Sequence, residues 1–113
     1  MSKPHRIAAG GITFKGETVL LVRYRDSDSS GTYLVGSGGA LEDNENVVQA
    51  IIRETEEETG ITVKPKRVVA IEDLNCSRFK MIKIWMVCDF IEGEIRKTEG
   101  AEKEEIIEAA WFT

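Results

Sequence analysis

Residues 45–59 have the apolar spacing of an amphipathic helix, and Gly60 follows as a residue suited to the left-handed position after a helix. When these residues are placed at about 100° per residue, Glu54, Glu57 and Glu58 share an arc of about 100°. The residues of a neighbouring arc, which we expect to pack on a sheet, are Val48, Ile51, Ile52, Thr55 and Thr59. The helix therefore carries three acidic side chains beside its apolar face.

Three ionised carboxylates this close repel one another by roughly 4 kcal/mol per pair at 4 Å and an effective dielectric constant near 20. They also lie at the helix C-terminus, where the helix dipole disfavours anions. Arg53 offsets only part of this charge, while Glu56 points toward solvent. A hard divalent cation such as Mg²⁺ takes oxygen ligands and relieves the repulsion directly. The alternative is a solvated acidic helix end.

The net charge of the 113-residue chain, −5, is concentrated at this helix. Residues 41–60 contain seven acidic residues and one basic residue, and the remainder contains 13 acidic and 14 basic residues. This distribution argues against a broad basic face for nucleic acid. The chain has no apolar run of membrane-spanning length and no signal-peptide core at its N-terminus, so we expect a cytoplasmic protein that does not bind membranes.

The other apolar segments predict a mixed sheet in a single domain over residues 1–113. Strands are expected at residues 7–14, 18–24, 33–35, 68–74 and 81–90, and residues 106–112 form a strand or a short mixed segment. A turn at Lys15-Gly16-Glu17 joins the first two strands into a hairpin. Residues 36–39 and 92–105 are expected to be loops, and the order of elements indicates an α/β fold.

The glycine-rich loop Gly36-Ser37-Gly38-Gly39 leads to a helix start near Asn44. Such a backbone approaches a ligand closely and presents N–H and C=O groups to phosphate oxygens or a metal. From Gly39 to Ile61 the sequence GALEDNENVVQAIIRETEEETGI resembles the Nudix box, GX5EX7REUXEEXGU, in which U is apolar. All seven fixed positions match. Thr55 departs from the pattern because it occupies an apolar position, and Gly36-Ser37 replaces the Leu-Pro that often precedes the two glycines.

The resemblance to the Nudix hydrolase superfamily (MutT-like) extends over nearly the whole chain, because GGITFKGETVLLVRYR and EEIIEAAWF are similar to the flanking strands of the family. It implies an α/β/α sandwich around a mixed β-sheet. It also implies Mg²⁺- or Mn²⁺-dependent hydrolysis of a nucleoside diphosphate linked to another group. The small-molecule substrate would then be a nucleotide.

Carried over by position, the resemblance assigns the metal ligands to the Gly39 carbonyl, Glu54, Glu57 and Glu58. Glu45 and Arg53 form an ion pair that fixes the loop on the helix, since arginine offers a planar fork to a carboxylate. Bound metal ions neutralise the pyrophosphate and activate a water molecule.

A carboxylate takes the proton of that water. The candidates for this base are Glu54, Glu57 and the later acids Glu102, Glu104 and Glu105. Glu105 stands six residues before Trp111, a spacing similar to that of the family's late glutamate. The catalytic set is therefore expected to be Glu54, Glu57, Arg53 and Glu105. Substrate contacts are expected from Arg25, Gly38 and Gly39, with a surface role as the alternative for Arg25.

The substrate expected within the family is a nucleoside triphosphate or a related nucleotide. The alternatives are an ADP-ribose or nucleotide-sugar pyrophosphatase and a Nudix-fold nucleotide-binding module without catalysis. An acidic scaffold domain is the further alternative if the box is coincidental. Cys76 and Ser77 stand where the ADP-ribose subgroup tends to have a proline and the dinucleoside polyphosphate subgroup a tyrosine, which argues weakly against both.

Three further features of the sequence carry weaker expectations. The segment DSDSSG at residues 26–31 begins like a calcium-binding EF-hand loop, but Ser37 occupies the position of its final glutamate, so we expect a polar loop. Cys76 and Cys88 lack metal-binding spacing and are expected to be reduced. Family members usually continue past the last strand into another helix, whereas this sequence ends at Thr113; a domain without that helix would expose one sheet face and favour a homodimer.

Overall fold

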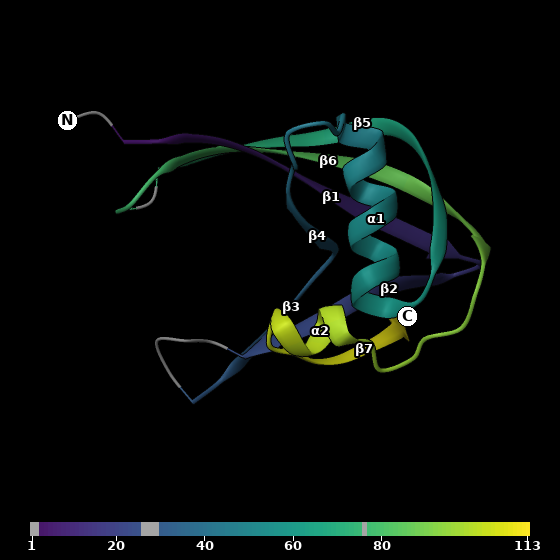
Figure 1. Ribbon diagram of the computed structural model, residues 1–113. Coiled ribbons are helices and arrows are strands. Elements are labelled where there is room, and N and C mark those ends of the chain that lie inside the picture. Colours follow the sequence, from purple (N-terminus) through teal and green to yellow (C-terminus); the bar gives the residue numbers. More distant parts are fainter. Residues whose placement is uncertain (1–2, 26–29, 76) are drawn as a thin grey trace.

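The computed structural model describes residues 3–25, 30–75 and 77–113. The elements in chain order are β1 (His5–Lys15), β2 (Thr18–Arg25), β3 (Thr32–Val35), β4 (Ser37–Ala40), α1 (Val47–Thr59), β5 (Thr62–Asn75), β6 (Lys80–Glu92), α2 (Glu99–Lys103) and β7 (Ile106–Phe112) (Figure 1). Two features discussed above, the acidic part of the residue 26–31 loop and the Cys76 thiol, lie outside the described residues.

The strands form one mixed sheet in the order β3-β2-β1-β6-β5, with β4 paired to β1 and β7 paired to β2. β1 runs parallel to β6 over a long register, from His5 opposite Lys80 to Phe14 opposite Asp89, and its pairings with β2 and β4 are antiparallel. The predicted mixed sheet is therefore confirmed. The predicted hairpin between the first two strands is present too.

The segment Ser37–Ala40 is strand β4, so the prediction of a loop over residues 36–39 is wrong for most of that segment. β4 pairs with Ala8–Gly11 of β1, where the residues are as small as its own. Two strands of small residues leave space on the sheet for a helix to approach closely. This pairing joins distant segments, so the local glycine content could not reveal it.

The segment 92–105 is not wholly a loop, because Glu99–Lys103 forms the short helix α2. The Thr98 side chain caps this helix by accepting a hydrogen bond from the Ala101 N–H. α2 packs against the C-terminal part of α1, where a Cβ on Gly100 would lie 2.6 Å from the Glu57 carbonyl oxygen. The helix therefore follows from packing on α1 rather than from apolar periodicity.

Helix α1 begins and ends with strong local signals. Asn46 and Gln49 form a reciprocal capping box, in which each side chain accepts a hydrogen bond from the other residue's backbone N–H. Gly60 adopts the left-handed conformation at φ 87°, and its N–H donates to the Glu56 carbonyl. The helix thus starts two residues later than predicted and ends where predicted.

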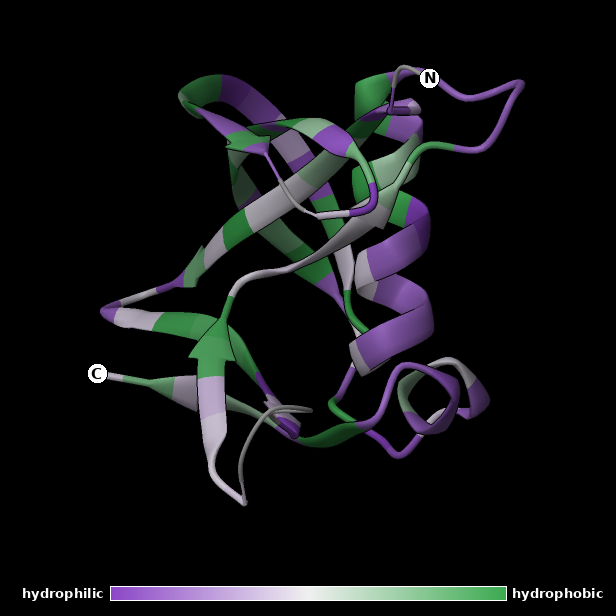
Figure 2. Cartoon of the chain, turned by 90° about the vertical axis from the view of Figure 1, so that its left-hand side faces the viewer, coloured by the Kyte–Doolittle hydropathy of each residue, from purple (hydrophilic) through white to green (hydrophobic). Residues whose placement is uncertain are grey.

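The buried face of α1 includes Ile51, Thr55 and Thr59 as predicted, but it extends further toward the acidic residues. Val48 was expected to pack on the sheet, but it is 40% exposed, whereas Glu58 is 1% exposed. The buried residues of the helix are Ala50, Ile51, Glu54, Thr55, Glu58 and Thr59. The face is shifted toward the acids because β4 offers a glycine backbone against which carboxylates can lie. The outer side of the helix is hydrophilic, as Figure 2 shows.

The core lies between α1 and the central strands. Its buried residues are Ala9, Leu20, Ala50, Ile51, Ile61, Val63, Met86 and Cys88. Cys88 is a free thiol, and burial raises its pKa to about 11, so it stays protonated and unreactive near neutral pH. None of the helices in the described ranges has the length and apolar character needed to cross a membrane.

Candidate active site

Arg53 forms ion pairs with Glu45, which precedes α1, and with Glu54 and Glu57 within the helix. Its Nε and Nη2 atoms lie 2.6 and 2.8 Å from the two carboxylate oxygens of Glu45, which is a bidentate ion pair. Its Nη1 atom donates to Glu54 at 2.9 Å and to Glu57 at 3.1 Å. A fifth hydrogen bond runs from Nη2 to the Ala40 carbonyl oxygen at 3.3 Å. One guanidinium therefore ties α1 to the end of β4 and to the segment between them.

Glu45 holds the Arg53 guanidinium in place through both of its carboxylate oxygens. Hydrogen bonds from Arg53, and a further one from the Glu42 backbone N–H, lower the pKa of Glu45 to about 2. The carboxylate thus remains ionised throughout the neutral range. The ion pair expected from the sequence between residues 45 and 53 is present in this geometry.

Glu58 lies inside the protein, in contact with strands rather than with solvent. Its Oε1 accepts a hydrogen bond from the Gly38 N–H at 3.1 Å, and its Oε2 accepts one from the Tyr24 hydroxyl at 3.2 Å. Tyr24 in turn stacks on Tyr33 with ring centroids 5.5 Å apart. The carboxylate is therefore held from β4 on one side and from β2 on the other.

Glu54 lies beside Glu58 and against the backbone of Gly39. A Cβ on Gly39 would lie 2.7 Å from Glu54 Oε1, so a side chain at residue 39 would displace this carboxylate. Burial raises the pKa of Glu54, and burial together with the Glu54 charge raises the pKa of Glu58 to about 8. The two acids are thus close together, and Arg53 forms an ion pair with only one of them, Glu54.

The donor set suits a hard divalent cation, because the two buried carboxylates and the Gly39 carbonyl supply only oxygen atoms. Within the described residues, however, no three acidic, histidine or cysteine side chains converge on one point. The Glu57 side chain is half exposed and forms an ion pair with Arg53. Two of the three predicted acidic ligands are therefore adjacent, and the third lies within the same ion-pair network.

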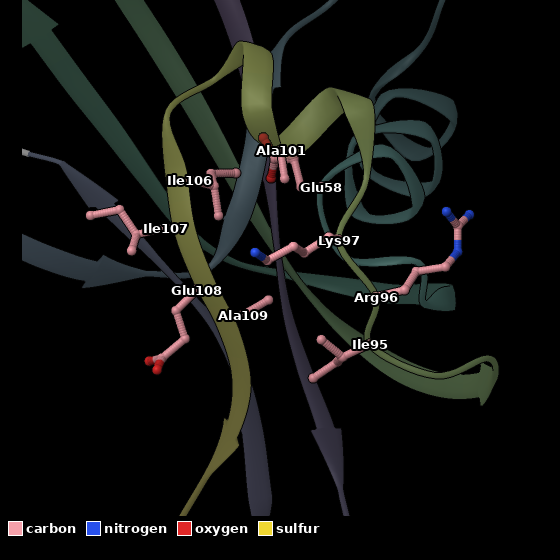
Figure 3. Close-up of a pocket in the computed structure, with 9 residues that line it drawn as sticks. All are labelled: Glu58, Ile95, Arg96, Lys97, Ala101, Ile106, Ile107, Glu108 and Ala109. Carbon is pink, nitrogen blue, oxygen red and sulfur yellow. The ribbon is translucent and has the colours of Figure 1, made fainter.

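The C-terminal end of α1 is fixed by the segment that precedes β7. The Thr98 hydroxyl donates to the Glu57 carbonyl, and the Arg96 N–H donates to the Thr59 carbonyl at 3.0 Å. Beside this contact is a cavity of about 290 Å³ between residues 95–97 and β7. Glu58 lines one end of this cavity, and Lys97 points into it while Arg96 points away (Figure 3).

Two residues expected in the site are not brought against the carboxylates. The Glu105 backbone has a left-handed φ of 59°, and its carbonyl accepts from the Arg25 N–H, but neither the Glu105 nor the Arg25 side chain forms a hydrogen bond or ion pair with another described residue. Arg25 is exposed at the end of β2. Their roles as base and substrate contact remain predictions.

Sequence reasoning missed Tyr24, Thr98 and Lys97. No spacing rule links residue 24 to residue 58, because packing of a helix on a strand creates that contact. Thr98 had a weak signal as a threonine before an acidic segment, the typical start of a helix. Lys97 had none.

The arrangement of a glycine-rich strand, a capped helix and an arginine that binds several glutamates has a counterpart among known families. The NUDIX domain family matches residues 4–113 of this chain. The chain belongs to the Nudix hydrolase family. The segment from Gly39 to Ile61 that resembles the Nudix box therefore corresponds to the end of β4, helix α1 and the residues between them.

Two relatives have named activities. This Nudix chain is 29% identical over 104 residues to the ADP-ribose pyrophosphatase of Methanocaldococcus jannaschii, a match that covers 90% of the chain and 61% of that protein. It is 27% identical over 99 residues to an 8-oxo-dGDP phosphatase of Homo sapiens, which covers 85% of the chain and 28% of that protein. The chain thus spans less than two thirds of the length of either relative.

The fold comparison agrees with the family assignment. A NUDIX hydrolase from Nitrosomonas europaea superposes with a TM-score of 0.80 and 24% identity, covering 98% of this chain and 73% of that chain. The protein therefore has the α/β Nudix fold that the sequence predicted.

Proposed function

We propose that this Nudix domain hydrolyses the pyrophosphate bond of a nucleoside diphosphate derivative and that Mg²⁺ or Mn²⁺ is its cofactor. The observation that carries the proposal is the pair Glu54 and Glu58, which are buried side by side over the backbone of Gly38 and Gly39. A protein seldom buries two adjacent carboxylates unless a cation or a shared proton compensates them. The family to which the chain belongs generally uses divalent metals.

The residues that would hold the metal are the Gly39 carbonyl, Glu54, Glu57 and Glu58. The bound metal would neutralise phosphate oxygens and lower the pKa of an attacking water. Arg53 sets the positions of Glu54 and Glu57, because it is itself held in a fork by Glu45. The Gly38 N–H and the Tyr24 hydroxyl orient Glu58.

The water's proton goes to a carboxylate, and Glu54, Glu57 and Glu105 are the candidates for this base. Arg25 at the end of β2, and the Gly38 and Gly39 backbone, are proposed substrate contacts. Lys97 adds a cation in the cavity beside Glu58, where a phosphate group of the substrate would find a partner. Its role would be seen as a rise in KM after Lys97→Ala.

The substrate is proposed as a chemical class. One relative is named for ADP-ribose and the other for 8-oxo-dGDP, and both compounds contain a nucleoside diphosphate. We therefore propose a nucleoside diphosphate derivative and place ADP-ribose first. Nucleoside triphosphates, the class expected from the sequence, form the second arm of the test.

The test is hydrolysis of a nucleotide panel that contains ADP-ribose, nucleotide sugars, nucleoside di- and triphosphates with their oxidised-base forms, and a diadenosine polyphosphate. Each compound is incubated with Mg²⁺, with Mn²⁺ and with chelator, using the wild type and Glu57→Gln. Turnover of one class that requires metal and falls at least about 100-fold in the variant supports the proposal. The matched control is Glu56→Gln, which removes an exposed acid from the outer side of the same helix. Absence of metal-dependent turnover by folded protein would favour a nucleotide-binding module.

A further inference from the structure

Strand β5 has one paired edge and one free edge. Thr62–Asn75 bonds to β6 along its inner side, and no other strand of the described residues pairs with its outer side (Figure 1). All residues from Lys66 to Asp73 are exposed. Within this segment Val68 is 51% exposed, Val69 44% and Ile71 65%. An edge strand with consecutive exposed apolar residues is a template for pairing with another strand.

The sequence of this segment, KRVVAIED, is complementary to itself when two copies run antiparallel. Its basic residues come first, its apolar residues form the centre and its acidic residues come last. In the register centred between Val69 and Ala70, Val68 faces Ile71 of the second copy, and Arg67 faces Glu72 of the second copy. Opposite charges and apolar pairs that face each other across two strands stabilise a sheet.

The β-bulge at Val69 makes this register geometrically consistent. Directly opposed residues of an antiparallel pair share one face of the sheet. In a regular strand Val68 and Ile71 would point to opposite faces, because they are three positions apart. The bulge between Val68 and Ala70 changes the alternation: Val68 lies opposite Met86 and Ile71 opposite Ile84, two positions apart on β6. Both apolar side chains therefore lie on the same face.

Arg67 and Glu72 must also share one face of the sheet if they are to face each other across the two copies. Arg67 lies opposite Val87, and Glu72 lies opposite Lys83, four positions apart on β6. These two side chains therefore share the other face. Arg67 forms no hydrogen bond or ion pair among the residues that the structure describes, so its charge is available to a second copy. Glu72 accepts one hydrogen bond from the Trp85 indole through Oε1, which leaves its second oxygen available.

We propose that β5 pairs antiparallel with β5 of a second copy of this chain, which forms a two-fold symmetric dimer with one sheet continuous across both copies. The interface is isologous, so each contact occurs twice. The dimer buries the exposed apolar centre of β5 and pairs Arg67 with Glu72 of the second copy in both directions. The proposal is independent of the proposed hydrolysis, because β5 contributes none of the residues assigned to the metal site.

Sedimentation velocity over a wide range of protein concentration tests the interface. The wild type is expected to show a monomer–dimer equilibrium. Arg67→Glu places two acids opposite each other and Glu72→Lys places two bases opposite each other, so each single variant should weaken dimerisation about tenfold or more. The double variant restores the pair with its charges exchanged, so its dimer dissociation constant should lie within about threefold of the wild-type value.

Two controls separate the interface from folding. Glu17→Lys, in the turn between β1 and β2, changes the same charge away from β5 and should leave dimerisation unchanged. Urea unfolding of each variant shows whether the loss of the Trp85 contact in Glu72→Lys affects the fold. A wild type that remains monomeric at every concentration overturns the proposal. A dimer that is indifferent to the single reversals, or a double variant that is no better than the singles, overturns it equally.

Discussion

The Ser37 hydroxyl lies 2.8 Å from the Thr55 hydroxyl, and both residues are buried. Ser37 is the first residue of β4, and Thr55 faces it from the middle of α1. These are two of the positions at which the sequence departs from its family pattern, since Ser37 replaces a proline and Thr55 replaces an apolar residue. The two departures therefore form one hydrogen bond, and each supplies the partner that the other needs.

This pairing predicts strong coupling between the two positions. Ser37→Ala or Thr55→Val alone leaves one buried hydroxyl without a partner and should lower the free energy of unfolding by about 1–3 kcal/mol. The double variant removes both hydroxyls and should lose less than the sum of the single losses. Urea unfolding at constant pH measures all four proteins. Ser37→Ala combined with Thr62→Val on β5 serves as the control pair, for which additive losses are expected. If the losses of unfolding free energy in Ser37→Ala and Thr55→Val were additive, the predicted coupling would be contradicted.

Much of the architecture could be predicted from local signals. The helix end at Gly60, the hairpin between β1 and β2 and the mixed sheet follow from turn residues and from runs of apolar residues, which act over a few positions. The strand β4 could not be predicted this way, because its glycines favour a loop when they are considered alone. Only the small residues of β1, distant in sequence, make the pairing possible.

The orientation of α1 was also not fully predictable from local sequence signals. An apolar arc was expected to face the sheet, but the helix is rotated so that Glu58 is buried and Val48 is exposed. Hydrophobic periodicity assumes that buried means apolar. Here the Gly38 N–H and the Tyr24 hydroxyl compensate a carboxylate, so the rotation depends on hydrogen bonds between distant segments. The motif identified the acidic residues, and tertiary contacts determined their environments.

The fork geometry of Arg53 predicts that lysine cannot replace it. A single ammonium cannot bond both oxygens of Glu45 and also reach Glu54 and Glu57. Arg53→Lys should lower the free energy of unfolding by about 2 kcal/mol and the kcat/KM of the reaction by at least about tenfold. Urea unfolding and steady-state kinetics measure the two effects. Arg78→Lys is the matched control, since the Arg78 side chain lies in an exposed loop. Wild-type kinetics for Arg53→Lys would show that the network does not position the glutamates.

The raised pKa of Glu58 predicts that the metal-free protein loses stability as the pH rises. The folded carboxyl holds its proton up to about pH 8, whereas the unfolded one releases it near pH 4.5. The contribution is therefore fully present below about pH 4.5 and is lost as the pH rises through about 8. Unfolding by urea in chelator should show a lower free energy of unfolding at pH 8 than at pH 5.5.

Two comparisons isolate this effect. Glu58→Gln should flatten the slope between pH 5.5 and 8. Glu45 acts in the opposite sense, since its lowered pKa of about 2 contributes stability above its unfolded value, but that contribution is lost only in acid, outside this window. Excess Mg²⁺ should reverse the slope, because a metal binds the ionised carboxylates and its affinity rises with pH. An unchanged slope in Glu58→Gln would assign the pH dependence to other groups.

We predict that the Tyr24 hydroxyl contributes to metal binding and that this contribution can be removed without disturbing the fold. Tyr24→Phe keeps the stacked ring but removes the hydrogen bond to Glu58 Oε2, so that this carboxylate is held only by the Gly38 N–H. Loss of such an orienting contact should weaken the affinity for Mn²⁺ by about 10–100-fold, measured by calorimetric titration without substrate. Tyr33→Phe is the matched control, because its ring belongs to the same stack while its hydroxyl does not contact Glu58. Equal losses in the two variants would indicate that the aromatic stack, rather than the hydrogen bond, determines the affinity.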